Sequence, residues 1–226
     1  YIESDRLPVA NLTGCFLSNE LLDSFPVHRI MVKNGELKEL YVVERDNDIM
    51  EIIDNLSDPQ LEQRFTDLNI TLAEDQIAEV NLIVSSWLTG ISQALHKGFI
   101  WTIDYGDLSE RLYSPDMRFR GSLTTYYKHT QTDNPFLNIG AQDITSQVDF
   151  TSLMQMGNEL GLKSYFYGTQ RELMHILGFK MFMTKLLDSQ SDQRTKANNR
   201  FGLNSLVDIN GLGKFKALIQ GKHIDN

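Results

Sequence analysis

The sequence predicts an α/β protein built on one mostly parallel sheet whose last strand is antiparallel. Short apolar segments without polar alternation recur along the chain, as is typical of strands covered on both faces. Segments with apolar residues three and four positions apart separate them, as crossover helices do in a parallel sheet. The expected strands are residues 15–17, 99–103, 162–167 and 215–220.

Composition limits the possible classes of protein without naming a function. The 226 residues are 41% hydrophobic and 23% charged, which suits a globular chain with one sizeable core. No run approaches the roughly 20 apolar residues of a membrane helix, and the first residues lack the features of a signal peptide. We therefore expect no membrane insertion and a cytosol-like compartment.

The formal net charge is −9, from 21 basic and 30 acidic residues. This balance argues against a nucleic-acid partner, because proteins that bind nucleic acid carry clustered Lys and Arg. A basic partner suits the charge better. Ordinary solubility is the favoured explanation, because net charge bears on solubility before it bears on partners.

The first expected strand leads directly into acidic residues. Residues 18–20 leave it at its carboxyl end, where open α/β sheets bind ligands. Glu20 and Asp23 are three positions apart and would share one face of a helical turn, which Pro26 ends. The alternative is that these acids cap a helix. Cys15, within the apolar strand, is expected to be a buried structural thiol.

The segment between the first two strands should begin with a hairpin at residues 27–43. Asn34 and Gly35 form its turn, since both residues tolerate positive φ. Residues 44–69 are polar, with one short helix near 59–65. Thr71 and Glu74 match a capping box, and apolar spacing predicts a long helix from about residue 77 to 95.

Residues 107–149 show little periodicity but many polar and aromatic side chains, which is typical of a functional cover. Helices are expected at 150–160, 169–177 and 179–199. Residues 211–214 lack the spacing of a phosphate loop and should form a turn.

Three segments resemble the signature segments of the MidA family of S-adenosylmethionine-dependent methyltransferases: residues 18–28, 103–106 and 140–151. That family includes the mitochondrial arginine methyltransferase that acts in respiratory complex I assembly. Shorter matches occur at 121–123, 126–129, 169–170 and 211–215. The resemblance covers residues 14 to 220.

The resemblance implies a class I, Rossmann-like methyltransferase fold. The glycine-rich cofactor loop and the acid that binds the ribose hydroxyls do not occur in this chain. Residues 1–226 are therefore expected to be the carboxyl-terminal part of a single methyltransferase domain that lacks its first three strands. Insertions are expected at about 27–97 and 107–149. The implied cofactor is S-adenosyl-L-methionine.

The implied site residues follow from the matched segments. Paired carboxylates can grip a guanidinium bidentately and direct one nitrogen at the methyl group. Glu20 and Asp23 are the catalytic candidates, and no metal is expected. The cofactor-binding candidates are Ser18, Asn19 and Glu20. The substrate-binding candidates are Asp104, Tyr105, His129, Gln142 and Asp143, for which ordinary loop hydrogen bonding is the alternative.

The family also implies partners and location. We expect a protein substrate that presents arginine, of which a respiratory complex I type subunit is an example, and a homodimer is an option. The location would be cytoplasmic in a bacterium or the mitochondrial matrix in a eukaryote. The alternative function is a non-catalytic assembly or binding factor that keeps the methyltransferase fold.

Overall fold

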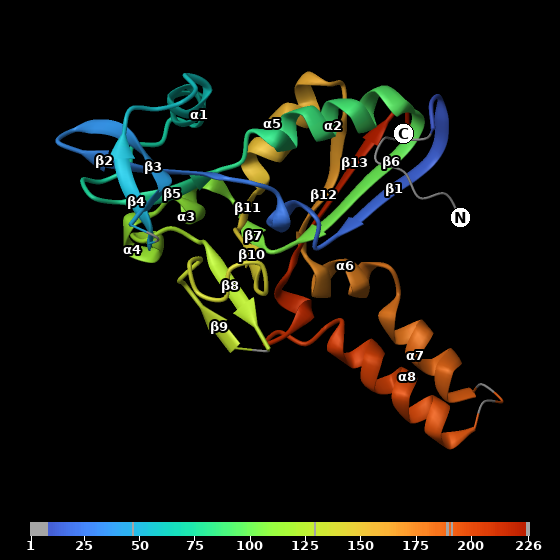
Figure 1. Cartoon of the computed structure of the whole chain (residues 1–226). Coiled ribbons are helices and arrows are strands. Elements are labelled where there is room, and N and C mark those ends of the chain that lie inside the picture. Colours follow the sequence, from blue (N-terminus) through green and yellow to red (C-terminus); the bar gives the residue numbers. More distant parts are fainter. Residues whose placement is uncertain (1–8, 47, 129, 189, 191, 225–226) are drawn as a thin grey trace.

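The structure, a computed structural model, describes residues 9–46, 48–128, 130–188, 190 and 192–224. Its centre is a four-stranded sheet with helices α2 (Ile83–Ala94) and α5 (Phe150–Glu159) on one face (Figure 1). A second sheet lies to one side of this centre. A pair of helices projects from the other side.

The central sheet has the order β1-β6-β13-β12. Strand β1 (Leu12–Asn19) pairs in parallel with β6 (Leu95–Asp104). Strand β13 (Lys216–Lys222) is antiparallel to both of its neighbours, β6 and β12 (Lys163–Thr169). The four segments expected to be strands therefore share one sheet, and the last of them in sequence is antiparallel.

The expected burial of Cys15 is wrong, because its side chain is exposed. Strand β1 lies at the edge of the sheet, and its neighbour Phe16 packs against the core beneath α2 and α5. Side chains alternate between the two faces of a strand. Cys15 and Leu17 therefore point to the opposite face, where Leu17 is 66% exposed.

The inserted sheet has the order β4-β3-β2-β5 and carries helix α1 (Gln60–Leu68). The expected hairpin is confirmed: β2 (His28–Lys33) and β3 (Glu36–Arg45) are antiparallel, and Asn34 and Gly35 have φ of 54° and 76°. Strand β4 (Asp48–Asp54) was not expected. The Glu74 carboxylate accepts hydrogen bonds from the amides of both turn residues.

The long helix expected from residue 77 to 95 is wrong at its start, whereas its end agrees with the structure to within one residue. Its first part is strand β5 (Ile77–Val80), which pairs with β2, and α2 begins only at Ile83. Ala78 and Val80 are buried in the core of the inserted sheet. Pairing and burial thus outweigh the helical spacing, and Glu74 stabilises the hairpin turn in place of capping a helix.

Residues 106–149 hold more regular structure than expected. The helices are α3 (Ser109–Leu112) and α4 (Pro115–Arg118). Strands β7 (Gly106–Asp107) and β11 (Val148–Asp149) pair in parallel. A small sheet has the order β10-β8-β9, formed by Asp143–Thr145, Thr124–Tyr127 and Thr130–Thr132. These strands form a cover beside the central sheet (Figure 1).

After β12, helix α6 (Gln170–Ile176) begins with a capping box of Thr169 and Glu172. The single helix expected at 179–199 is wrong, because α7 (Phe179–Asp188) and α8 (Gln193–Ser205) form a helical hairpin. Asp192 caps α8. The expected turn at 211–214 contains a short 3₁₀ segment, Leu212–Lys214. In the part of the chain that the structure describes, no helix is long and apolar enough to cross a membrane.

Gly98→Ala is expected to destabilise the protein by about 2 kcal/mol, because φ at Gly98 is +142° and an added Cβ would lie 1.8 Å from the Gly14 carbonyl oxygen of β1. Gly35→Ala is the control, since Gly35 also has positive φ but nothing lies within 4 Å. Urea unfolding of both variants measures the difference. Equal losses would show that the β1–β6 contact is not the cause.

Candidate active site

The carboxyl ends of β1 and β6 lie side by side and carry the acidic residues. Asn19 is in register with Ile103, and the Glu20 amide donates to the Ile103 carbonyl oxygen at 3.0 Å. Glu20 has φ of +47°, so the chain turns sharply as it leaves the strand. The 3₁₀ segment Leu22–Ser24, labelled η1, follows directly. Glu20 and Asp23 are thereby placed above the end of β6.

Asp104 fastens this turn to the sheet from below. Its carboxylate is fully buried, and one oxygen accepts from the Leu21 and Leu22 amides at 3.1 and 2.9 Å. The other oxygen accepts from the Tyr105 amide at 2.8 Å. Burial, followed by the nearby Asp23 charge, raises the pKa of Asp104 to about 6. Burial and the Glu20 charge likewise raise the pKa of Asp23.

A cleft of about 1000 Å³ opens above these strand ends. Five predicted site residues line it together: Glu20, Asp23, Tyr105, Gln142 and Asp143. Its walls come from the turn after β1, from the cover strands and from the segment before β13. A cavity of this size is large enough for a substrate side chain and part of a cofactor.

Three other predicted residues, Ser18, Asn19 and Asp104, do not line the cleft. Ser18 is buried, and its hydroxyl donates to the Trp101 carbonyl oxygen at 3.4 Å. Asn19 is exposed and donates to the Glu20 carboxylate at 3.2 Å. Asp104 lies beneath the cleft, and His129 is outside the described residues.

Two basic residues of the cleft were not predicted as site residues. Arg118 ends α4, and Lys214 precedes β13; both line the cleft. The Lys214 ammonium lies 5.0 Å from the centre of the Tyr105 ring. Because β13 is antiparallel to β6, its amino end meets the carboxyl end of β6. That antiparallel last strand was the signal in the sequence that could have placed Lys214 here.

Gln142 shows how the cover is held in place. Its side-chain amide donates to the carbonyl oxygens of Asn134 and Pro135 at 3.2 and 2.9 Å. The Ser146 amide donates to the Asp23 carbonyl oxygen at 2.9 Å. The cover therefore contacts the turn that carries Glu20 and Asp23 directly. The side-chain nitrogen of Gln142, a predicted substrate-binding residue, is already used in hydrogen bonds within the loop.

A second pocket of about 400 Å³ adjoins the cleft and shares Asp23 and Ser146 with it. Its wall toward the inserted sheet includes Leu40, Val42 and Glu51. His28, Arg29 and Glu39 also line it. Apolar side chains from both sides contribute as well: Phe25, Pro26, Val27, Leu123, Phe136 and Ile144. The combined surface leads from the carboxylates to the inserted sheet, which suits an extended ligand.

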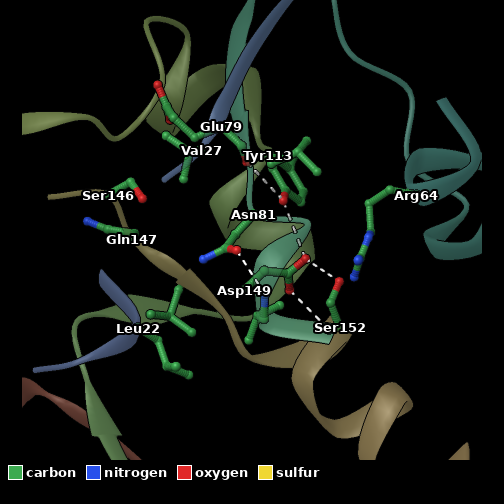
Figure 2. Close-up of a pocket in the computed structure, with 13 residues that line it drawn as sticks. Leu22, Val27, Arg64, Glu79, Asn81, Tyr113, Ser146, Gln147, Asp149 and Ser152 are labelled. Carbon is green, nitrogen blue, oxygen red and sulfur yellow. Dashed lines mark hydrogen bonds between the residues drawn. The ribbon is translucent and has the colours of Figure 1, made fainter. Parts of the chain in front are cut away.

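A small internal cavity near Asp149 is a structural feature rather than a ligand site. Figure 2 shows Tyr113 and Ser152 directed at the Asp149 carboxylate, with Arg64 extending from α1. Asp149 also accepts from Ser109 and caps α5. The cavity measures about 30 Å³, which is room for a water molecule. Among the described residues, no cluster of three or more His, Cys, Asp or Glu could hold a metal ion.

The contribution of Asp104 to the free energy of unfolding is expected to fall as the pH rises from about 4 to about 6. An unfolded Asp loses its proton near pH 3.9, whereas folded Asp104 keeps its proton up to about pH 6. In this window Asp104 binds more protons in the folded state than in the unfolded state, so its contribution to stability falls with pH. Urea unfolding between pH 4 and 7 measures the slope. An Asp104→Asn variant with the same slope would exclude Asp104 as its source.

Comparisons with known proteins identify relatives of this chain. The model of a family described as "Putative S-adenosyl-L-methionine-dependent methyltransferase" matches residues 3–168. A curated Caenorhabditis elegans protein, "Protein arginine methyltransferase NDUFAF7 homolog, mitochondrial", is 28% identical over 209 residues. That match covers 89% of this chain and 46% of the relative, so the chain spans about half the relative's length.

Solved structures share the fold. A COG1565 superfamily member from Burkholderia thailandensis bound to S-adenosyl-homocysteine superposes with a TM-score of 0.86 at 24% identity, over 99% of this chain and 57% of that chain. A native structure of a COG1565 superfamily protein from the same organism superposes with a TM-score of 0.86 at 23% identity, over 99% of this chain and 59% of that chain. By its family match, the chain belongs to the S-adenosyl-L-methionine-dependent methyltransferases of MidA type.

Proposed function

We propose that the protein methylates arginine side chains of a protein substrate, with S-adenosyl-L-methionine as the methyl donor. The observation that carries this proposal is the pair of carboxylates, Glu20 and Asp23, on the wall of the cleft at the carboxyl end of β1. The use of S-adenosyl-L-methionine is a property of the family. The arginine substrate is the part that needs a test.

The acidic site suits a guanidinium for electrostatic and chemical reasons. A protonated guanidinium is a planar cation with five donors, and it is a poor nucleophile while its charge is delocalised. Two carboxylates can bind its nitrogens bidentately, localise the charge and turn one nitrogen toward a methyl donor. Buried Asp104 holds the backbone of this turn in place. Positioning of this kind supplies much of the acceleration in a transfer reaction.

The residues present can supply one side of a cofactor site. Asn19 is exposed at the carboxyl end of the edge strand β1, and Glu20 faces the cleft. Both fit a polar ligand at this edge, whereas the buried Ser18 hydroxyl, which bonds to the backbone of β6, fits poorly. When bound, the cofactor supplies an electrophilic methyl group on a sulfonium. Asn19 and Glu20 would contact it, and Glu20 and Asp23 together would hold the guanidinium.

The name of the Caenorhabditis elegans relative supports the arginine substrate and a mitochondrial location. We extend both to this protein: the substrate would be a protein of the respiratory complex I type, methylated in the matrix if the source is a eukaryote. The acidic net charge fits a substrate whose arginine stands in a basic segment.

Transfer of a labelled methyl group tests the proposal in the full-length protein. We expect label from S-adenosyl-L-methionine to appear as methylarginine after acid hydrolysis of an arginine-containing substrate protein. Label on lysine or on a carboxyl group would overturn the arginine assignment. Cofactor binding without transfer to any protein, together with retained partner binding, would favour the non-catalytic assembly factor.

A further inference from the structure

The helical hairpin of α7 and α8, here called the arm, contacts α6 at its base and extends away from the central sheet (Figure 1). No side chain of residues 179–187 or 193–205 is buried. The two helices have 10 and 13 residues. Isolated helices of about 12 residues are marginal in water and depend on packing for their stability. The arm therefore needs a surface to pack against.

The surface of the arm is apolar and basic. Met181, Phe182, Leu187 and Phe201 are 51%, 52%, 55% and 78% exposed. Residues 179–205 contain five basic side chains and two acidic ones, in a chain whose net charge is −9. The basic residues are Lys180, Lys185, Arg194, Lys196 and Arg200. An apolar surface with basic neighbours suits an apolar partner with acidic neighbours.

Such a surface occurs at the other end of the same molecule, on strands β3 and β4. Val42, Ile49 and Ile53 are 61%, 40% and 47% exposed. The pairing of Val42 with Glu51, Leu40 with Ile53 and Glu44 with Ile49 places these side chains on one face of the sheet. We call the described residues 42–46 and 48–54 the acidic patch, which contains Glu44, Asp46, Asp48, Glu51 and Asp54 against the single Arg45. Glu44 and Glu51 share the face of Val42, and Glu51 pairs with Arg29. Asp48 and Asp54 lie on the other face of the same two strands.

Figure 1 shows the arm and the acidic patch at opposite ends of the molecule, so they do not meet within one copy. We propose that two copies form a twofold dimer in which the arm of each copy docks on the acidic patch of the other. Twofold symmetry lets both contacts form in one closed pair. Each contact joins exposed apolar side chains and brings opposite charges together.

The dimer would also complete the surroundings of the cleft. Leu40, Val42 and Glu51, from the face that carries the acidic patch, line the pocket that adjoins the cleft. The last residue of α8, Ser205, lines the cleft itself. An arm docked on the patch would place residues of the second copy at the mouth of the adjoining pocket. This consequence for substrate binding rests on the proposed function, whereas the dimer does not.

Charge reversal in the full-length protein tests the contact. Variant A carries Lys185→Glu and Arg200→Glu, so that its arm and its patch are both acidic. Variant B carries Glu44→Lys, Asp46→Lys and Asp48→Lys, which leave two acidic and four basic residues in the patch, so that its arm and its patch are both basic. All five substituted residues are exposed. We expect A alone and B alone to sediment as monomers, and an equimolar mixture to form a dimer, because both contacts then join opposite charges.

A control variant with Glu62→Lys, Glu110→Lys and Asp133→Lys changes the net charge as variant B does, at exposed positions away from the patch, and should dimerise like the parent. Phe201→Ser should weaken the parent dimer at least tenfold, and at concentrations where the parent is monomeric the two proteins should have the same melting temperature. Three results would each overturn the proposal. The first is a parent that stays monomeric at about 100 μM, a concentration at which a dimer with a micromolar Kd would be formed. The second is that variants A and B associate like the parent, which would place the contact elsewhere, for example at the exposed edge of β1. The third is a mixture of A and B that does not associate. Monomers that bind anionic lipid vesicles through the arm would assign the arm to a membrane surface.

Discussion

Glu20→Gln in the full-length protein is expected to lower the rate of methyl transfer by roughly 30- to 1000-fold, which corresponds to about 2 to 4 kcal/mol. Glutamine keeps the length and one oxygen of the side chain but removes the charge that a guanidinium requires. Glu20 lines the cleft, and its backbone amide, which the substitution leaves in place, bonds to the Ile103 carbonyl oxygen. The melting temperature should therefore change little.

Asp23→Asn should lower the rate similarly if Asp23 is the second carboxylate that binds the guanidinium. If Asp23 only stabilises the 3₁₀ segment, the substitution should lower the free energy of unfolding by about 1 kcal/mol and leave the specific activity unchanged. Both variants are measured by labelled methyl transfer and by thermal unfolding. Glu62→Gln, an exposed carboxylate on α1, is the matched control. Unchanged turnover with a lower melting temperature would make both residues structural and favour the assembly factor.

The sequence predicts the central sheet well because its strands are contiguous apolar segments. Residues 99–103 and 215–220 need no information from distant parts of the chain to be recognised as strands. The Asn34-Gly35 turn is similarly local, since positive φ suits both residues. The structure adds the pairing, in which β13 lies between β6 and β12.

The elements that the sequence mispredicts depend on distant contacts. Ile77 and Val80 fit a helix by spacing, but β2 supplies an edge for pairing and a core for burial. The exposure of Cys15 follows from the position of β1 at the edge of the sheet, which an apolar segment alone does not reveal. The arm keeps helical spacing on both sides of its turn, so periodicity cannot separate α7 from α8.

The candidate site was partly predictable for a topological reason. Carboxyl ends of parallel strands meet at one edge of a sheet, so Glu20, Asp23 and Tyr105 were expected together. Lys214 was missed because it precedes an antiparallel strand, whose amino end reaches the same edge. The burial of Asp104 could not be foreseen, because it depends on the turn after β1 folding over it.

Asp104→Ala is expected to lower the free energy of unfolding by about 3 to 5 kcal/mol, because each buried amide left without an acceptor costs roughly 1 to 3 kcal/mol. Three amides lose their acceptor, those of Leu21, Leu22 and Tyr105. The first two belong to the turn that carries Glu20 and Asp23. Activity should therefore fall together with stability.

Asp104→Asn keeps the shape of the Asp104 side chain but removes its charge, so it separates the two contributions. Its amide oxygen can still accept from Leu21 and Leu22, and only the Tyr105 amide then faces a donor, so the expected loss is about 1 to 2 kcal/mol. Urea unfolding gives the stabilities, and hydrogen exchange reports the Leu21 and Leu22 amides directly. Exchange there should accelerate in the alanine variant and stay slow in the asparagine variant. If both amides stayed protected in the alanine variant, Asp104 would not be the anchor of the turn, and the positions of Glu20 and Asp23 would have to come from the cover strands alone.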